Sequence, residues 1–198
     1  MTAELSSILT VPDVIAAAVT AAGWPGTVLP RKRIGGCQLY PVVQIDRQVW
    51  CERIGHAQGP EYDMSALSIW ESWTVDSDPM PPASAVSIVG FVSDARPTVA
   101  VRAVAATSGL GAGLVVDTGA SAPTKITMMD CDANDVGLVW APPQHDPQHL
   151  VVGRSGPVAA ARRLVLTRYF EELFFGWAVM ASGAPVTWQW NRPPLSSA

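Results

Sequence analysis

Residues 115–121 of the chain read VVDTGAS, and residues 150–154 read LVVGR. Both stretches lie in the segment 96–182, where short apolar runs alternate with turns rich in Gly, Pro, Asp and Ser. Runs that repeat about every 8–12 residues are typical of strands in an antiparallel sheet. The apolar residues after position 155 recur instead at three- and four-residue steps, which is the period of an amphipathic helix. The segment therefore predicts a β-meander that ends in one long helix.

The same reasoning places the other strands along the chain. β-branched and aromatic residues bounded by turn residues predict strands, because such side chains pack well on a pleated surface. The predicted strands are 38–45, 48–54, 85–92, 98–105, 113–117, 125–130, 136–141 and 150–153.

Helices are predicted at both ends of this series of strands. Thr10 is a favourable cap for a helix over 13–22, and Ser155 is a favourable cap for the long helix, which Gly183 would end. A short helix that runs into a strand is expected within 65–75. The sequence thus brackets the sheet with an N-terminal and a C-terminal helix.

The fold class that follows is α+β, with an antiparallel sheet of about six to seven strands flanked by those two helices. At 198 residues the chain is long enough to bury a substantial core, so we expect a single domain over 1–198. Residues 76–82 (DSDPMPP) form the best internal boundary, because a Pro-rich segment cannot enter the interior of a sheet. We expect this linker to separate two halves of one domain.

The composition points to a protein with an apolar partner surface. Only 15% of the residues are charged, against about 25% in an average soluble domain, while 48% are hydrophobic and eight are tryptophan. No apolar run approaches the ~18 residues of a membrane span. The first residues lack the basic start of a signal peptide, and three cysteines do not make a disulfide framework. We therefore expect a cytoplasmic protein without a membrane span.

The charge balance argues against nucleic acid as a partner. Seventeen acidic residues face thirteen basic ones, which gives a net charge of −4, whereas nonspecific nucleic-acid binding needs a basic surface. Eleven of the basic residues are Arg and two are Lys, a bias typical of a high-GC, actinobacterial-like genome.

The one enzymatic motif is centred on Asp117. Two apolar residues followed by Asp-Thr-Gly-Ala-Ser resemble the catalytic loop of retropepsin-like aspartic peptidases, and residues 150–154 resemble the second hallmark segment of that family. The resemblance implies a homodimer in which Asp117 of each copy shares one proton with the other. The alternative interpretation is that residues 117–119 form an ordinary hairpin turn between two strands.

Two other polar groups have structural explanations. His145 and His149 stand four residues apart, but the prolines around them rule out the helix that would align both for a metal ion, so we expect a solvated loop, no metal and no cofactor. Arg162 and Arg163 lie where they oppose the dipole of the expected C-terminal helix. We expect an acidic group of the same protein to offset them.

Residues 112–173 are similar in layout to EspG, the cytosolic chaperone family of mycobacterial type VII secretion. The shared features are a strand that ends in Asp117-Thr118, a strand pair with the turn Asp130–Asp135, a strand with Trp140, a loop with Pro142-Pro143, and an amphipathic helix. The resemblance implies a non-catalytic protein that shields an apolar helical client.

The function we expect from the sequence is protein binding, by a chaperone-like or adaptor-like module that docks an apolar partner surface. The low charge and the tryptophans support this interpretation. We expect Phe175, Trp177, Trp188 and Trp190 at the interface with a protein partner or another copy of the chain. The alternatives are the Asp117 peptidase and a structural subunit of a larger homo-assembly such as a phage virion component.

Overall fold

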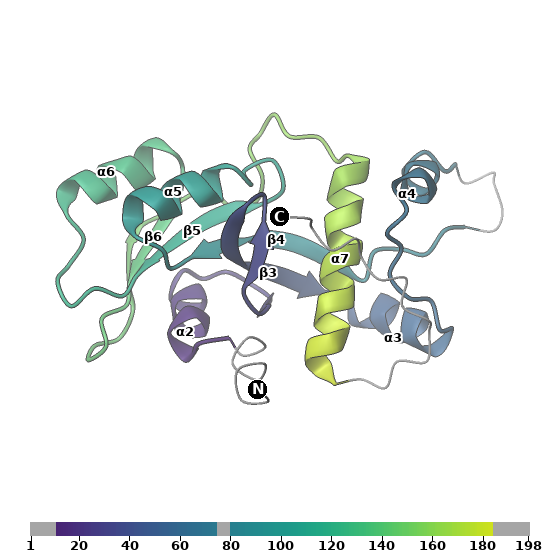
Figure 1. The fold of residues 1–198 in the computed structure, drawn as a ribbon, viewed down its shortest axis with the longest axis horizontal. Helices are drawn as coiled ribbons and strands as arrows, with labels where there is room; N and C mark the ends of the chain where they lie inside the picture. Colours follow the sequence, from purple (N-terminus) through teal and green to yellow (C-terminus); the bar gives the residue numbers. More distant parts are fainter. Residues whose placement is uncertain (1–10, 75–79, 184–198) are drawn as a thin grey trace. The chain divides into compact units, whose positions relative to one another are not determined.

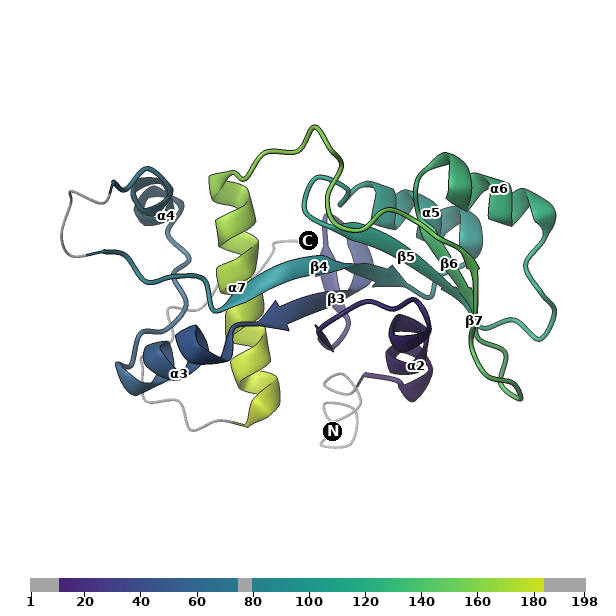
Figure 2. The ribbon, with the colours of Figure 1, turned by 180° about the vertical axis from the view of Figure 1, so that it is seen from behind.

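The computed structural model describes residues 11–74 and 80–183, and these contain six helices and seven strands (Figures 1 and 2). The chain forms two compact units, each built from two segments. Residues 1–44 and 88–161 make the first unit, and residues 45–87 and 162–198 make the second. The expected boundary at 76–82 lies inside a segment of the second unit.

The elements of the first unit are mainly strands of one sheet. They are α2 (Asp13–Ala21), β1 (Thr27–Val28), β2 (Lys32–Ile34), β3 (Cys37–Ile45), β4 (Val86–Ser93), α5 (Pro97–Ala105), β5 (Ala112–Asp117), α6 (Lys125–Ala133), β6 (Gly137–Trp140) and β7 (Gln148–Val151). The strand order is β1-β3-β4-β5-β6-β7, with β2 paired to β3. The α+β class and the number of strands agree with the prediction.

The antiparallel sheet predicted from the sequence is wrong at its centre. β4 pairs with β5 in parallel, and β5 pairs with β6 in parallel, whereas β1 and β2 on β3, and β7 on β6, are antiparallel. The sheet is therefore mixed. The reason is that the segments 98–105 and 125–130, predicted as strands, are the helices α5 and α6, which cross between parallel strands.

Helix signals in both segments account for this difference. Pro97 occupies the first turn of α5, and the buried residues 100, 101, 103 and 104 repeat with a helical period. The hydroxyl of Thr124 caps α6 by accepting a hydrogen bond of 3.2 Å from the amide of Thr127. The third wrong strand, 48–54, is helix α3 (Arg47–Gly55), capped by Asp46.

Helices cover both faces of the sheet in the first unit. Ile15 and Ala18 of α2 are buried in one cluster with Leu114 and Val116 of β5. Gly113 points to the other face, where an added Cβ would lie 2.9 Å from a methyl of Val104 in α5. Since side chains alternate along a strand, α2 and α5 pack on opposite sides of β5. The predicted helix over 13–22 is confirmed, with Pro12 as its cap and residue 10 outside the described residues.

The main elements among the described residues of the second unit are helices. It contains α3, α4 (Met64–Glu71) and α7 (Val165–Ser182), and α4 packs against α7. The predicted end of the long helix is confirmed, because Gly183 follows it with a left-handed φ of 64°. Its predicted cap at Ser155 is wrong by nine positions, since residues 152–164 are irregular and Leu164 is the cap. The helix predicted within 65–75 is α4, and Trp73 and Thr74 after it form no strand.

Candidate functional site

Of the four aromatic residues predicted at a partner interface, the structure describes Phe175 and Trp177, and these two do not share an exposed surface. Phe175 is fully buried, with its ring 5.2 Å from that of Trp50 in an edge-to-face contact and 4.3 Å from the Arg53 guanidinium. Its burial corrects the sequence prediction, because a side chain without exposed surface is a core residue of this unit. Trp177 is half-buried, with its ring 5.3 Å from that of Phe174. Trp188 and Trp190 lie outside the described residues.

A buried ionic network surrounds Glu172 of α7. Each of its two carboxylate oxygens accepts a hydrogen bond of 2.7 Å from Arg53. The carboxylate also accepts a hydrogen bond of 3.0 Å from Arg168 and one of 3.1 Å from the Glu61 amide. Glu172 is 0% exposed and Arg53 is 1% exposed. Arg53 also donates to the carbonyl oxygens of Gly59 and Ala83. Because Glu172 pairs with both arginines and Arg53 also donates to two carbonyl oxygens, we interpret the network as a structural link between α3 and α7.

Sequence analysis missed this network, although it contained one signal. Arg168 and Glu172 stand four residues apart in an otherwise apolar and aromatic helix, which is the spacing of a side-chain pair on one helical face. The second partner, Arg53, is 119 positions away from Glu172 along the chain. Only the folded structure brings it to the pair.

The predicted acidic partner of the arginines before α7 is present for Arg163. Its guanidinium donates hydrogen bonds to Glu171 at 2.7 and 2.9 Å, and to Glu71 at 3.0 and 3.3 Å. The hydrogen bonds to Glu171 are the main cause that raises the pKa of Arg163, so the side chain stays charged. This pairing offsets the unfavourable position of a cation at the start of a helix.

Asp117 closes a turn from a strand to a helix. It ends β5, and its Oδ1 accepts a hydrogen bond of 2.9 Å from the Gly119 amide. Trp140 of the neighbouring β6 donates from its indole nitrogen to the Gly119 carbonyl at 2.8 Å. The hairpin interpretation of this motif is wrong, since α6 follows the turn. The second peptidase-like segment contains Gly153, where an added Cβ would lie 2.3 Å from the Gly137 amide nitrogen.

Another polar cluster lies at the end of the parallel strand β4. Asp94 forms an ion pair with Arg31 and accepts a hydrogen bond of 3.3 Å from the Tyr40 hydroxyl. The Arg31 guanidinium also stacks over the Tyr40 ring at 5.1 Å. Burial, and next the charge of Asp94, raise the pKa of Tyr40, so this phenol remains a neutral donor. The cluster links β3 to the end of β4, and its charged and polar groups pair with one another.

The residues considered for a metal site are dispersed. No group of three or more His, Cys, Asp or Glu side chains in the described part of the chain is placed to hold a metal ion. His145 and Asp146 belong to an open surface loop, whereas Cys131 of α6 is 0% exposed. Burial, and secondarily Asp130, raise the pKa of the Cys131 thiol to about 11.

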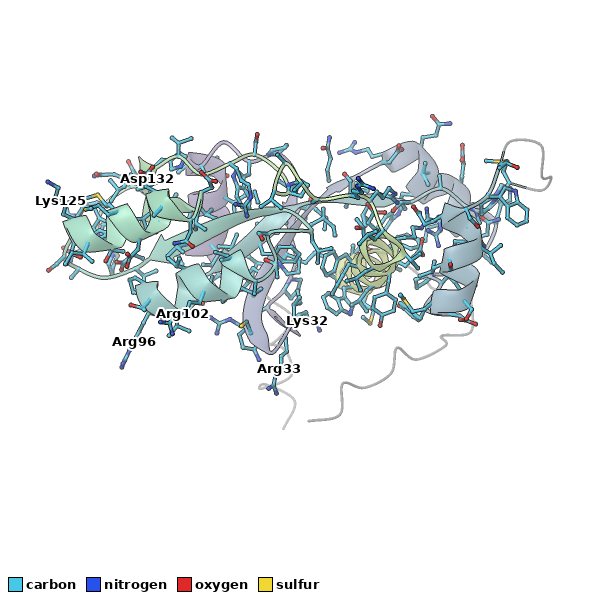
Figure 3. The ribbon with its side chains drawn as sticks, turned by 90° about the horizontal axis from the view of Figure 1, so that it is seen from above. Lys32, Arg33, Arg96, Arg102, Lys125 and Asp132 are labelled. Carbon is cyan, nitrogen blue, oxygen red and sulfur yellow. The ribbon has the colours of Figure 1, made fainter. Side chains whose placement is uncertain are left out.

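The outer surface of α6 is the most unusual exposed feature among the described residues. Ile126 and Met129 are 72% and 62% exposed, more than any other large apolar side chain on a described helix. They stand three positions apart, so both lie on one side of the helix. Lys125 and Asp132 are exposed near the two ends of α6 and are drawn on it in Figure 3. We call these four residues the α6 face.

The arginines of α5 do not contribute to this face. Arg96 and Arg102 extend from α5 in the direction away from α6 (Figure 3). Lys125 and Asp132 therefore have no arginine of the α5 segment beside them. A sequence argument could have found this face, because Ile126 and Met129 share a helical side with Lys125 and Asp132 once 125–133 is read as a helix.

Comparison of the chain with protein-family models, with curated proteins and with solved structures found no match. The similarities to retropepsin-like peptidases and to EspG therefore rest on the residues quoted above and stay predictions. In the layout shared with EspG, the strand pair expected around Asp130–Asp135 is not formed, because residues 125–133 are the helix α6. Among the residues that the structure describes, no helix combines the length and the apolar character that crossing a bilayer requires.

Proposed function

We propose that this protein is a non-catalytic binding module that docks an apolar surface of a protein partner through the α6 face. The observation that carries the proposal is the exposure of Ile126 and Met129, at 72% and 62%, on one side of a regular helix. Apolar side chains at a helical spacing form the ridge by which one helix packs against another. We take this pair as the centre of the proposed interaction surface, because both side chains lie on one side of the helix.

The chemistry of the face specifies the partner more closely. Ile126 and Met129 supply the apolar contact, and methionine adapts its shape to a partner because its side chain is unbranched and flexible. Lys125 and Asp132 add one charge of each sign at the ends of the ridge. We infer that the partner presents an amphipathic helix with an acidic group placed opposite Lys125 and a basic group placed opposite Asp132.

This proposal agrees with what the EspG-like layout implies, namely a protein that shields an apolar helical client in the cytoplasm. It moves the expected contact surface from Phe175 to α6, because Phe175 is buried. The contribution of Trp177, Trp188 and Trp190 to a partner surface stays a prediction.

The proposal is tested by introducing charge into the ridge. We expect the double variant Ile126→Glu/Met129→Glu to lose a partner that the unmodified protein retains in a pull-down from the cells that produce it. Val152→Glu is the matched control, because Val152 is 80% exposed and lies outside α6. Equal retention of all partners by the double variant would contradict the proposal. Surface substitutions of this kind change stability by only about 0.5 kcal/mol, so both variants should fold.

A further inference from the structure

The charges on α6 stand where the helix itself disfavours them. Lys125 is the first residue of the helix, at the positive end of its dipole, and Asp132 lies in the last turn, at the negative end. The first turn holds no acidic residue and the last turn holds no basic residue. Within the described part of the chain neither side chain has an ionic partner. Both side chains are exposed, so an opposite charge brought beside either of them by a partner would be favourable.

The same residues form a pattern that is complementary to itself. Lys125, Met129 and Asp132 are separated by four and three positions, so they follow one side of the helix, with Ile126 beside Met129. The distance along the axis between residues 125 and 132 is about 10.5 Å, and Met129 lies near its middle. When a second α6 lies antiparallel across a twofold axis at Met129, each lysine faces the aspartate of the other copy.

We propose that the partner of the α6 face is a second copy of this chain, bound as a twofold-symmetric dimer through antiparallel α6 helices. The inference rests on the proposed function and names its partner. Met129 packs against Met129 of the second copy, Ile126 flanks this contact, and two Lys125–Asp132 pairs close its ends. An isologous contact of this kind needs only one patch, because the symmetry presents the same residues on both sides. The antiparallel arrangement also places each unfavourable charge next to a compensating one.

The size of the face determines the strength of the contact. A helix of nine residues is about 13.5 Å long, and its exposed side is smaller than the ~800 Å² per partner of a stable interface. The dimer is therefore weak and reversible, and its fraction rises with protein concentration. We expect to detect the dimer by sedimentation velocity, as a sedimentation coefficient that increases with protein concentration.

Charge reversal tests the pairing directly. Lys125→Glu places two carboxylates opposite each other, and Asp132→Lys places two ammonium groups opposite each other. Each single substitution should raise the dissociation constant of the dimer by about tenfold or more, since two pairs change from attraction to repulsion. Both substitutions improve the electrostatics of the isolated helix, so unfolding of α6 does not explain a loss of dimer. Thermal unfolding of each variant provides the control for folding.

Restoration by the swapped charges distinguishes this geometry from a general surface effect. The double variant Lys125→Glu/Asp132→Lys should dimerise as the unmodified protein does, because both pairs are re-formed with reversed polarity. An equimolar mixture of the two single variants should also recover, since each lysine then meets a glutamate or aspartate of the other chain.

Three results would overturn the inference: a monomer at all concentrations, single variants that associate like the unmodified protein, or a double variant that does not recover. The failure of this inference can be distinguished from a failure of the proposed function. If the protein is monomeric but still loses a different partner in the Ile126→Glu/Met129→Glu variant, the face binds another protein and only the inference of self-association is wrong.

Discussion

Glu172 is a buried carboxylate that receives hydrogen bonds from two arginines and one backbone amide. Its replacement by Gln leaves the buried Arg53 guanidinium without a counter-charge, and breaking a buried ion pair typically costs about 3–5 kcal/mol. We expect Glu172→Gln to lower the free energy of unfolding by about that amount in urea denaturation followed by circular dichroism. Glu71→Gln is the matched control, because its partner Arg163 is 47% exposed and such pairs contribute at most about 1 kcal/mol. Equal decreases in the free energy of unfolding for both substitutions would show that burial of the ion pair does not determine how much its loss destabilises the protein.

Cys131 gives the protein a defined sensitivity to alkaline pH. Its pKa is raised from 9.0 to about 11, so the folded protein holds the thiol proton at a pH where the unfolded chain has lost it. Its contribution to stability is therefore complete below pH 9 and is lost as the pH rises toward 11, by roughly 2 kcal/mol in total. Urea denaturation from pH 8 to 11 should show a steeper decline for the unmodified protein than for Cys131→Ala. Equal declines in the free energy of unfolding for the two proteins would contradict the raised pKa of Cys131.

Asp117 provides a test of the peptidase alternative at a single residue. Asp117→Asn retains a side-chain oxygen that can accept the hydrogen bond from Gly119, so we expect its stability to change by less than about 1 kcal/mol. The binding-module account predicts that neither protein cleaves an unfolded substrate between pH 4 and 6, where a shared-proton carboxylate pair is active. Cleavage by the unmodified protein that disappears in Asp117→Asn would establish the peptidase and overturn that account.

At the scale of the elements, Gly153 allows the chain that follows β7 to pass close to the start of β6. A Cβ at this position would lie 2.3 Å from the Gly137 nitrogen and 2.8 Å from the Asp135 oxygen, both backbone atoms that cannot rotate away. We expect Gly153→Ala to lower the melting temperature through a loss of about 2 kcal/mol or more. Gly109→Ala, where an added Cβ meets nothing within 4 Å, should be neutral or slightly stabilising. A neutral Gly153→Ala would mean that the two segments can separate without cost.

The sequence predicted the central strands and the first helix but misjudged what connects the strands. Val-rich residues 98–105 suggested a strand because β-branched side chains favour sheets, yet their buried positions follow a helical period. The cap at Thr124 was a usable sign of α6. Once both segments are recognised as helices, parallel pairing of β4, β5 and β6 follows, because such strands need crossover connections.

The beginning of α7 could not be read from capping residues alone. Ser155 and Pro157 are good helix starters, but the chain there is tied to distant segments, with the Arg154 amide bonded to the Asp135 carbonyl and the Val158 amide to the Ser108 carbonyl. These long-range bonds hold the backbone out of a helix. Local propensity was overridden by tertiary contacts that the sequence does not display.

At the scale of the whole chain, the two compact units each combine segments that are far apart in sequence. The low content of charge led us to expect an apolar partner surface, but composition does not indicate which residues are exposed. Phe175, expected at an interface, is buried, while Ile126 and Met129, expected within a strand, are exposed on a helix. The candidate site thus became visible only after the secondary structure of 125–133 was corrected.

The central claim, that the α6 face contacts a protein partner, is tested most directly by photo-crosslinking inside cells that produce the protein. A photoreactive amino acid is placed at position 126 or 129, and at position 99 of α5 as a control that is also exposed, at 57%. The account predicts a discrete crosslinked product from positions 126 and 129 and none from position 99. No product from the α6 positions, or equal products from all three, would contradict it.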